Sequence, residues 1–560
     1  MTVLRALAGP LLILALVAAV ASVPAGTGTW VYDDYGMLDS PMMDGPEDIP
    51  AALWRTSAHY IAKSDTPPDD GYLTTTWRPT TMVTLTASHV LGGERPGPHH
   101  VVSWLLLVTL GGLLLVTVGD GRKPSVGWAL GAGIVALHPA LGEAWLWING
   151  RSDLVAGVAL AGLGAVVWRT RERAPGTAEL ALAALITLAG AGGKETFVPA
   201  AVMVGLCALG RPGGRLLVGA IGTGVATFVG LRTVVLGSLE SGERVASQLL
   251  TADTLERVPL VWAAGLQTLA LPAPRPMRML AWELRDGWSA GAALTLGALL
   301  VVVVALLARK QWRPVLLLGG AAGCLAPTAY VGAAYWAGLD RYLVLPAILC
   351  FFAAWELGRG WTPGSKARRP LLAVLGASAL VVVASLAFTA TFYASSEEFC
   401  TTMVAQRPED PTGYLFYASE MVSERAPKTA SAILNEMPDV TLPPPIAREK
   451  IRLLLDLGRL EEAADLAESA HAQHPDARWL GLTTVVVRLA RRDEPGARQI
   501  LDRYTTDAAW CPIAKQWVGG FVASGPQMGP EVRASAVRLF EGAVCGEIEL
   551  PAVEEDVAAP

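Results

Sequence analysis

The sequence is poor in charge, in cysteine and in two polar residue types. Only 17% of its 560 residues are charged, whereas soluble domains usually carry about a quarter. Lysine occurs eight times and asparagine twice, so either residue in a motif stands out from the background. The six cysteines form no CxxC pair and no His/Cys cluster, which leaves no zinc motif. With 44 Lys and Arg against 50 Asp and Glu, a strongly basic nucleic-acid surface is excluded.

The sequence is instead rich in long apolar stretches, the last of which ends near residue 393. Residues 1–393 hold 28 Lys and Arg against 24 Asp and Glu, a net +4, while residues 394–560 hold 16 against 26, a net −10. A bilayer span needs about 20 mostly apolar residues. We therefore expect an all-α fold: a polytopic membrane domain over 1–393 with about eleven transmembrane helices, then a polar helical domain over 394–560. The candidate spans lie near 5–24, 100–118, 124–138, 152–168, 177–191, 196–210, 214–236, 288–308, 314–335, 342–358 and 370–393.

The distribution of Lys and Arg predicts the orientation, because these residues are retained on the cytoplasmic side of short loops. Alternate loops hold 15 of the 28 basic residues of the apolar region, and three short loops of the opposite set carry one each: Arg151, Lys194 and Arg341. The N-terminus is then cytoplasmic, and the loop 25–99, the loop near 237–287 and the tail are external. The first span also resembles a secretory signal peptide, and its cleavage, which stays open, would leave the later orientation unchanged.

The polar tail is predicted to form short amphipathic helices. The clearest unit begins at Leu457, with small residues at Ala463 and Ala467, and this spacing fits the helix-turn-helix unit of a 34-residue tetratricopeptide repeat. A shift of 34 residues places Ala497 on Ala463 and predicts three to four repeats. Such stacks form concave surfaces for a peptide or a partner protein, and a helical cap without a ligand is the alternative. Three cysteines lie in the tail, where one disulfide is possible and one cysteine stays unpaired: Cys400, Cys511 and Cys545.

Chemistry-bearing residues gather at the predicted external ends of the spans. Each could serve loop solvation or interfacial snorkelling alone, but ionisable groups near a bilayer cluster where they have partners or ligands. The densest stretch is HPALGEAWLWINGRSDL at residues 138–154. The candidate site residues, in chain order, are Asp33, Asp34, Arg78, His138, Glu143, Arg151, Asp153, Lys194, Glu195 and Arg341.

This placement favours group transfer from a lipid phosphate. A transporter normally places polar groups near the bilayer midplane, whereas the predicted spans are almost free of charge. At the rim, a lipid tail can stay in the bilayer while its phosphate meets Arg or Lys, and a carboxylate can deprotonate an acceptor hydroxyl. A noncatalytic scaffold that uses the external repeats and a transporter of lipid-linked substrates remain alternatives.

At these residues the chain resembles the GT-C superfamily of polytopic glycosyltransferases, and more closely the transmembrane-and-tetratricopeptide-repeat family of O-mannosyltransferase-like proteins and their bacterial relatives. It departs from the family at Gly142, where Thr is common, and at Ser103 and Leu107, where Asn and His are common. The matching features are YDDY at 32–35, RP at 78–79, HP at 138–139 with Glu143, WINGRSDL at 147–154, KE at 194–195, RY at 341–342 and the trailing repeats.

The resemblance implies a membrane enzyme that moves a sugar from a polyprenyl-phosphate donor to a protein or envelope-glycan hydroxyl. Asp33 or Asp34 would be the general base, with the other orienting it. No metal and no cofactor besides the lipid-linked donor is implied. Few Lys and Asn amid much Ala, Gly and Arg look like a high-GC bacterial genome, which favours a periplasmic site on the inner membrane. Donor phosphate would be held by Arg151, Lys194 and Arg341, the site would be shaped by His138, Glu143 and Asp153, and Arg78 and Glu195 complete the predicted binding set.

Overall fold

The structure is a computed structural model, and the part of the chain that it describes is helical, with no strand. The chain divides in the main into two compact units, one that runs to Thr402 and one from Met403 onward. Each unit is described by itself. The described residues are 2–27, 40–56, 59–60, 77–93, 95–119, 125–236, 252–274, 280–284, 287–334, 340–358, 365–475, 477–506, 511–524, 529–541, 543 and 546. The predicted all-α class is confirmed for these residues.

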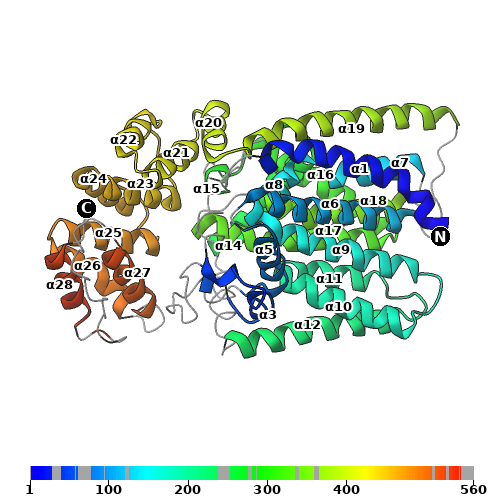
Figure 1. Ribbon diagram of the computed structural model, residues 1–560, viewed down its shortest axis with the longest axis horizontal. Helices are drawn as coiled ribbons and strands as arrows, with labels where there is room; N and C mark the ends of the chain where they lie inside the picture. Colours follow the sequence, from blue (N-terminus) through cyan, green and yellow to red (C-terminus); the bar gives the residue numbers. More distant parts are fainter. Residues whose placement is uncertain are drawn as a thin grey trace. The chain divides into compact units, whose positions relative to one another are not determined.

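Long apolar helices run side by side in the first unit (Figure 1). Among the described residues, seven helices are long and apolar enough to cross a membrane. These apolar helices indicate a multi-pass membrane protein. The seven are formed by α1 (Thr2–Thr27), α6 (Pro96–Gly119), α9 (Arg151–Arg169) with the 3-10 turn from Ile148, α12 (Gly214–Leu236), α16 (Ala290–Ala308), α18 (Val344–Gly358) with the 3-10 turn from Asp340, and α19 (Ser365–Phe392).

The expected count of about eleven spans is not confirmed. The helices α10 (Thr177–Gly193) and α11 (Phe197–Leu206) are apolar but only 17 and 10 residues long, which at 1.5 Å per residue falls short of a core about 30 Å thick. The helix α17 (Trp312–Ala334) forms as expected but is not among the seven. An eighth span is present only if α7 (Val126–Ala136) and the helical turns at Pro139–Leu146 count as one bent span.

Smaller helices complete the first unit. Those nearest the site are α5 (Pro79–Gly92), which begins at a proline, and the 3-10 turn η4 (Asp340–Leu343) before α18. The others are η1 (Pro41–Met43), α3 (Asp48–Ala51), α14 (Ala252–Ala270) and α15 (Leu280–Glu283).

The helix α9 is the centre of the first unit. In its span, 89% of the apolar window is buried, whereas the share for α16 is 11%. The helix α16 exposes Leu294, Leu300 and Val301, as a lipid-facing helix would. Glycines let neighbours approach α9 closely: a Cβ on Gly164 would lie 2.3 Å from the Phe352 ring of α18. Small residues at helix interfaces are typical of membrane bundles, and this glycine lets α18 pack closely against α9.

The second unit consists of helix pairs at a regular spacing. First helices begin at Pro411, Pro444, Arg478 and Cys511, so the offsets are 33, 34 and 33 residues. After α20 (Ser396–Gln406), the helices are α21 (Pro411–Ser423), α22 (Pro427–Glu436), α23 (Pro444–Asp456), α24 (Leu460–Gln473), α25 (Arg478–Ala490), α26 (Glu494–Thr505), α27 (Cys511–Ser524) and α28 (Pro530–Phe540).

Small residues permit close packing within these pairs. Ala463 and Ala497, which the predicted 34-residue shift superposes, are both fully buried. A Cβ on Gly481 would lie 2.0 Å from the Tyr504 hydroxyl, so only glycine lets α25 lie this close to α26. Cys511 is disulfide-bonded, in agreement with the one disulfide expected in the tail.

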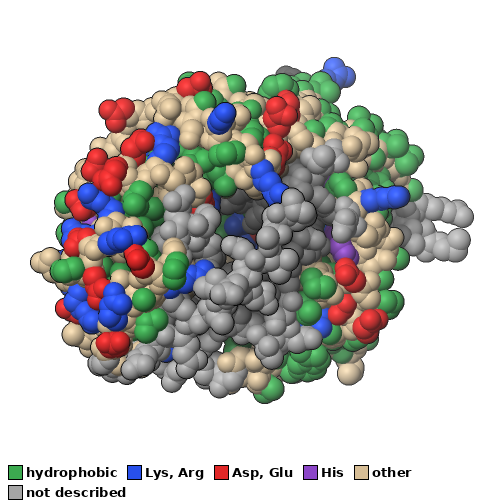
Figure 2. Space-filling view, turned by 60° about the vertical axis from the view of Figure 1, so that its left-hand side comes forward, with side chains coloured by type: hydrophobic (Ala, Val, Ile, Leu, Met, Phe, Trp, Pro, Cys, Tyr) green, Lys and Arg blue, Asp and Glu red, His purple; other side chains and the backbone are tan. Residues whose placement is uncertain are grey.

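The exposed face of the second unit carries charges of both signs. Acidic and basic side chains are interspersed where this unit comes forward in Figure 2. Among the described residues of this unit, Arg459 pairs with Glu462, Arg491 with Glu461 and Arg538 with Glu494. Arginines therefore offset part of the negative charge of the tail locally.

Candidate functional site

The proposed catalytic pair, Asp33 and Asp34, lies outside the described residues, so its role stays a prediction. The other eight predicted site residues are described, and all belong to the first unit. Six of them form three ion-paired groups, Arg151 is buried apart from these groups, and His138 caps the turn before Glu143.

A break in the third apolar stretch shapes the first group. Proline disfavours helical geometry in the residue before it, and His138, which precedes Pro139, has ψ of 128°. The helical pair on its two sides bends by 41°. The His138 side chain caps the next turn, since its Nδ1 accepts the Ala140 N–H at 3.2 Å. The chain then turns into the short helix α8 (Gly142–Leu146), which carries Glu143 into the bundle.

Glu143 lies in the interior beside Arg341. The side chain of Glu143 is 1% exposed; its Oε2 accepts the Arg341 N–H at 3.2 Å, and its Oε1 lies 3.8 Å from Arg341 Nε. Within the described part of the chain no donor is at hydrogen-bond distance from Oε1. The Arg341 guanidinium lies 4.9 Å from the Trp147 ring centroid and 5.3 Å from that of Tyr342, both within cation–π range.

The glycine before Glu143 lies where a side chain would be crowded. A Cβ on Gly142 would lie 3.2 Å from the methyl group of Thr389 on α19 and 3.3 Å from Leu146. The space that a Thr side chain would need at position 142 is therefore partly taken by Thr389.

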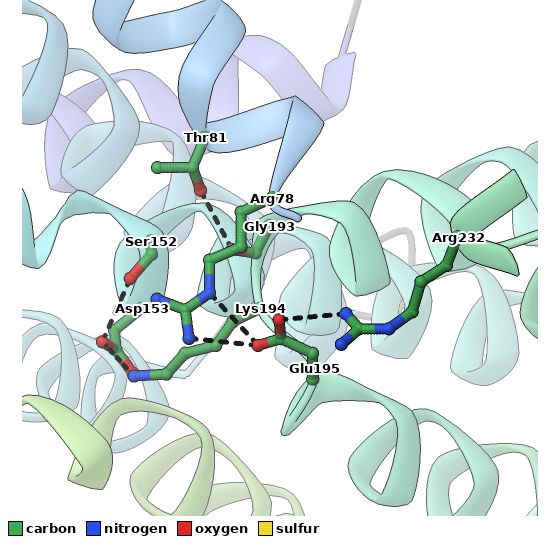
Figure 3. Close-up of polar contacts among 8 residues, drawn as sticks. All are labelled: Arg78, Thr81, Ser152, Asp153, Gly193, Lys194, Glu195 and Arg232. Carbon is green, nitrogen blue, oxygen red and sulfur yellow. Dashed lines mark hydrogen bonds and ion pairs between the residues drawn. The ribbon is translucent and has the colours of Figure 1, made fainter. Parts of the chain in front are cut away.

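The second group is the buried pair of Asp153 and Lys194. Asp153 lies in the first turn of α9, and Lys194 directly follows α10. The Lys194 Nζ contacts both carboxylate oxygens, with side chains only 4% and 2% exposed (Figure 3). The same Nζ lies 4.0 Å from the Tyr342 ring centroid. Burial lowers the pKa of Lys194, and the Asp153 carboxylate opposes that shift.

A glycine brings Lys194 this close to α9. A Cβ on Gly193 would lie 2.8 Å from the Val155 side chain, and the Gly193 carbonyl accepts a hydrogen bond from Thr81 of α5 at 3.0 Å (Figure 3). The Gly-Lys-Glu segment is therefore held between α9 and α5.

The third group joins two arginines through Glu195. Arg78, just before α5, donates from Nε to Glu195 Oε2 at 3.1 Å, and Arg232 of α12 donates from Nη1 to Oε1 at 3.3 Å. The side chains of Arg78, Glu195 and Arg232 are 28%, 34% and 23% exposed. Burial would raise the pKa of Glu195, but the two guanidinium groups outweigh it and hold that pKa below its ordinary value.

Arg151 lies apart from these groups in the interior. Its side chain is fully buried and donates to Ser103 Oγ and Ser88 Oγ, at 3.2 and 2.9 Å, and to the carbonyls of Thr84 and His99, at 3.0 and 2.7 Å. These contacts tie α9 to α5 and α6. Ser103, where the family commonly has Asn, thus still supplies an oxygen acceptor.

Two contributors were not among the predicted site residues. Arg232 lies inside a stretch counted as a span, and its signal was a lone arginine four residues before the end of that apolar helix. Tyr342 lies between Lys194 and Arg341 and faces both cations with its ring. Among the described residues, no three His, Cys, Asp or Glu side chains are grouped so that they could hold a metal ion, and the expectation of a metal-free site stays untested.

The geometry therefore gathers seven of the predicted residues at one end of the α9 and α18 helices, with Arg151 behind them. The cations differ in access: Arg78, Arg232 and Arg341 are each between a fifth and a third exposed, whereas Lys194 and Arg151 are buried. Guanidinium groups at such a rim suit a phosphate, and the buried Glu143 oxygen suits a hydroxyl donor.

Comparison with known proteins gives one partial similarity. No family model matches the chain, and no solved structure matches it. A stretch of 140 residues is 31% identical to Protein O-mannosyl-transferase Tmtc1 of Drosophila melanogaster, and this stretch is 25% of the present chain. It spans only 16% of the length of that curated relative. The similarity suggests glycosyltransferase activity at a coarse level and a relation to that kind of transferase at most.

Proposed function

We propose that this chain is a membrane glycosyltransferase of GT-C type that moves a hexose from a polyprenyl-phosphate donor to a hydroxyl of a protein or envelope glycan. The observation that carries the proposal is the grouping of partly exposed arginines and a buried carboxylate at one end of the apolar bundle. The partial similarity to an O-mannosyl-transferase supports the same reaction class.

The acidic and the basic residues have different roles in the proposed reaction. Asp33 or Asp34 takes the proton of the acceptor hydroxyl, whose oxygen then forms a bond to the anomeric carbon of the sugar. The bond between that carbon and the phosphate oxygen breaks, and polyprenyl phosphate leaves with the electron pair. The negative charge that develops on the phosphate is stabilised by nearby guanidinium groups, among them Arg341, and Glu143 accepts a hydrogen bond from a sugar or acceptor hydroxyl.

The second unit has the spacing of a tetratricopeptide array, and its concave side would hold an extended acceptor or a partner protein. The Lys and Arg distribution supports a cytoplasmic N-terminus in the inner membrane, with the site and the second unit in the periplasm. This arrangement would present a protein substrate to the same side of the membrane as the proposed catalytic aspartates.

The test is a transfer assay on the full chain in lipid nanodiscs with polyprenyl-phosphate hexoses, acceptor peptides and envelope glycans, read by mass spectrometry. We expect a product one hexose heavier. We expect the Asp33→Asn/Asp34→Asn double variant to lose it, while Glu47→Gln, an exposed carboxylate on the same loop, retains it. Absence of product with every donor, or full transfer by both single aspartate variants, would refute the proposal.

A further inference from the structure

An apolar cavity lies between three helices of the first unit, α1, α7 and α19. Its volume is about 300 Å³, and all of its lining residues are apolar. The helix α19 packs against both α1 and α7, and the three helices lie together along one edge of the unit in Figure 1. Water finds no hydrogen-bond partner in such a lining, so hydrocarbon is the filling that suits it.

The cavity has a closed floor and an open rim. Leu14 of α1 and Val382 of α19 are 5% and 1% exposed. Ile13 and Val126, which line the same cavity, are 65% and 59% exposed. From behind, α6 closes the floor, since a Cβ on its Gly111 would lie 2.1 Å from the Leu14 side chain. The cavity is therefore a groove that opens on the outer, lipid-facing surface of the bundle.

The groove is about as long as one leaflet is deep. It follows α7 from Val126 to Leu137, and the 11 residues of this helix rise by about 16 Å. Half of a hydrocarbon core about 30 Å thick is about 15 Å. The Val126 end lies away from the candidate site, because Trp128 packs edge-on against Trp355 near the end of α18, with ring centroids 4.8 Å apart. One acyl chain that enters at this end would fill the groove.

Two exposed arginines lie one turn beyond that end of the groove. Gly127, at the start of α7, lies level with α19, since a Cβ on it would be 3.8 Å from Leu372 and 3.6 Å from Leu375. Arg368 precedes Leu372 by four residues and is therefore on the same face of α19, and Arg369 is next to it. Both arginines are exposed, and within the described part of the chain neither forms an ion pair.

We propose that this groove holds one acyl chain of an anionic phospholipid, whose headgroup phosphate lies at Arg368 and Arg369. Ala379 and Val382 line the groove and continue the Arg368 face at helical spacing, so chain and headgroup follow a single face of α19. Arginine forms charge-assisted hydrogen bonds with phosphate, and basic residues at the membrane surface attract anionic lipids. This lipid site is separate from the candidate site and does not depend on the proposed function.

Gly133 allows the groove to be filled by the chain itself. It lines the groove, and a Cβ on it would meet no atom within 4 Å, so a leucine there takes the space of the acyl chain. Because leucine favours a helix more than glycine does, Gly133→Leu should fold at least as stably as the unmodified chain. The matched control is Gly297→Leu on α16, at an exposed glycine where a Cβ also meets no atom within 4 Å.

The experiment counts bound lipids by native mass spectrometry. The full chain in detergent is titrated with dioleoyl phosphatidylglycerol or with phosphatidylcholine of the same acyl chains. We expect one phosphatidylglycerol to bind about tenfold or more tightly than phosphatidylcholine. Gly133→Leu should lose this lipid without a lower unfolding temperature, and Arg368→Gln/Arg369→Gln should lose the preference between headgroups. The control Arg309→Gln/Lys310→Gln, at exposed basic residues after α16, should bind like the unmodified chain.

Three outcomes would overturn the lipid site. The first is equal phosphatidylglycerol affinity of Gly133→Leu and the unmodified chain, and the second is equal affinity of the unmodified chain for the two lipids. The third is displacement of phosphatidylglycerol by undecaprenyl phosphate at the same concentration, which would make the groove a prenyl-chain site. The same spectra give the mass of the chain and so verify that α1, one wall of the groove, is retained.

Discussion

The two ends of α9 and α18 carry similar charged residues in different settings. At the site end, Arg78, Arg232 and Arg341 are partly open to ligand. At the opposite end, Arg211 bonds Glu356 at 3.1 Å with side chains 5% and 4% exposed, and Trp168 of α9 donates to the same carboxylate oxygen. Arg211 also donates to the Val167 carbonyl at 3.2 Å.

This difference separates stabilising charge from functional charge. The Arg211–Glu356 pair is closed on all sides and links α18 to the end of α9 and to the turn after α11, so its contribution is to the fold. The site end contains one such closed pair, Asp153 with Lys194, surrounded by arginines that solvent or a ligand can reach. Breaking one group at a time should therefore give different combinations of lost stability and lost activity.

The largest effect is expected from Lys194→Met. It leaves the Asp153 carboxylate buried without its cation, which costs about 3–5 kcal/mol of unfolding free energy when one partner of a buried pair is removed. Thermal unfolding in detergent would measure the loss, and sugar transfer should fall with it. Lys310→Met, at an exposed lysine of the same unit, is the control. A second variant, Lys194→Met with Asp153→Leu, removes both charges and should regain much of the stability; no regain would show that the pair is not a closed one.

A smaller loss, confined to stability, is expected from Glu356→Gln. The amide oxygen can still accept the hydrogen bonds of Trp168 and Arg211, but it no longer compensates the buried guanidinium, so we expect a cost of about 1–3 kcal/mol. Transfer per folded molecule and the KM for the lipid donor should stay unchanged. A raised KM with unchanged stability would contradict the division between the two ends.

The equivalence of Ala463 and Ala497 follows from a local rule. The 34-residue shift predicts it before any packing is known, and both side chains are fully buried. The contact between Glu143 and Arg341 joins residues 198 positions apart; the sequence placed both at the external ends of the spans but could not predict that they pair.

Burial could not be predicted in the same way. Lys194 and Arg341 both appear in the sequence as the one base of a short loop between predicted spans, but their side chains are 4% and 21% exposed, which depends on the helices that surround them. Arg232 was counted as part of a span because the apolar stretch continues past it. The stretches 177–191 and 196–210 were expected to be spans, whereas α10 and α11, which form there, are 17 and 10 residues long. A short apolar helix inside a bundle has the same composition as part of a span.

The smallest effect is expected in the pH dependence of the unfolding free energy, through Glu195 at the partly exposed site end. The pKa of Glu195 in the folded chain is held below its ordinary value by Arg78 and Arg232, so its ionised form stabilises the fold at a pH above the unfolded pKa of about 4.3. That contribution is lost as the pH falls through the lower, folded pKa. Because the group is partly exposed, it amounts to about 1 kcal/mol or less.

The difference in unfolding free energy between the unmodified chain and Glu195→Gln should be constant from pH 8 to about 5 and should shrink below that. The control is Glu172→Gln, at a carboxylate that is 83% exposed. A difference that grows on acidification would mean that Glu195 is better stabilised when protonated, which two guanidinium neighbours do not allow.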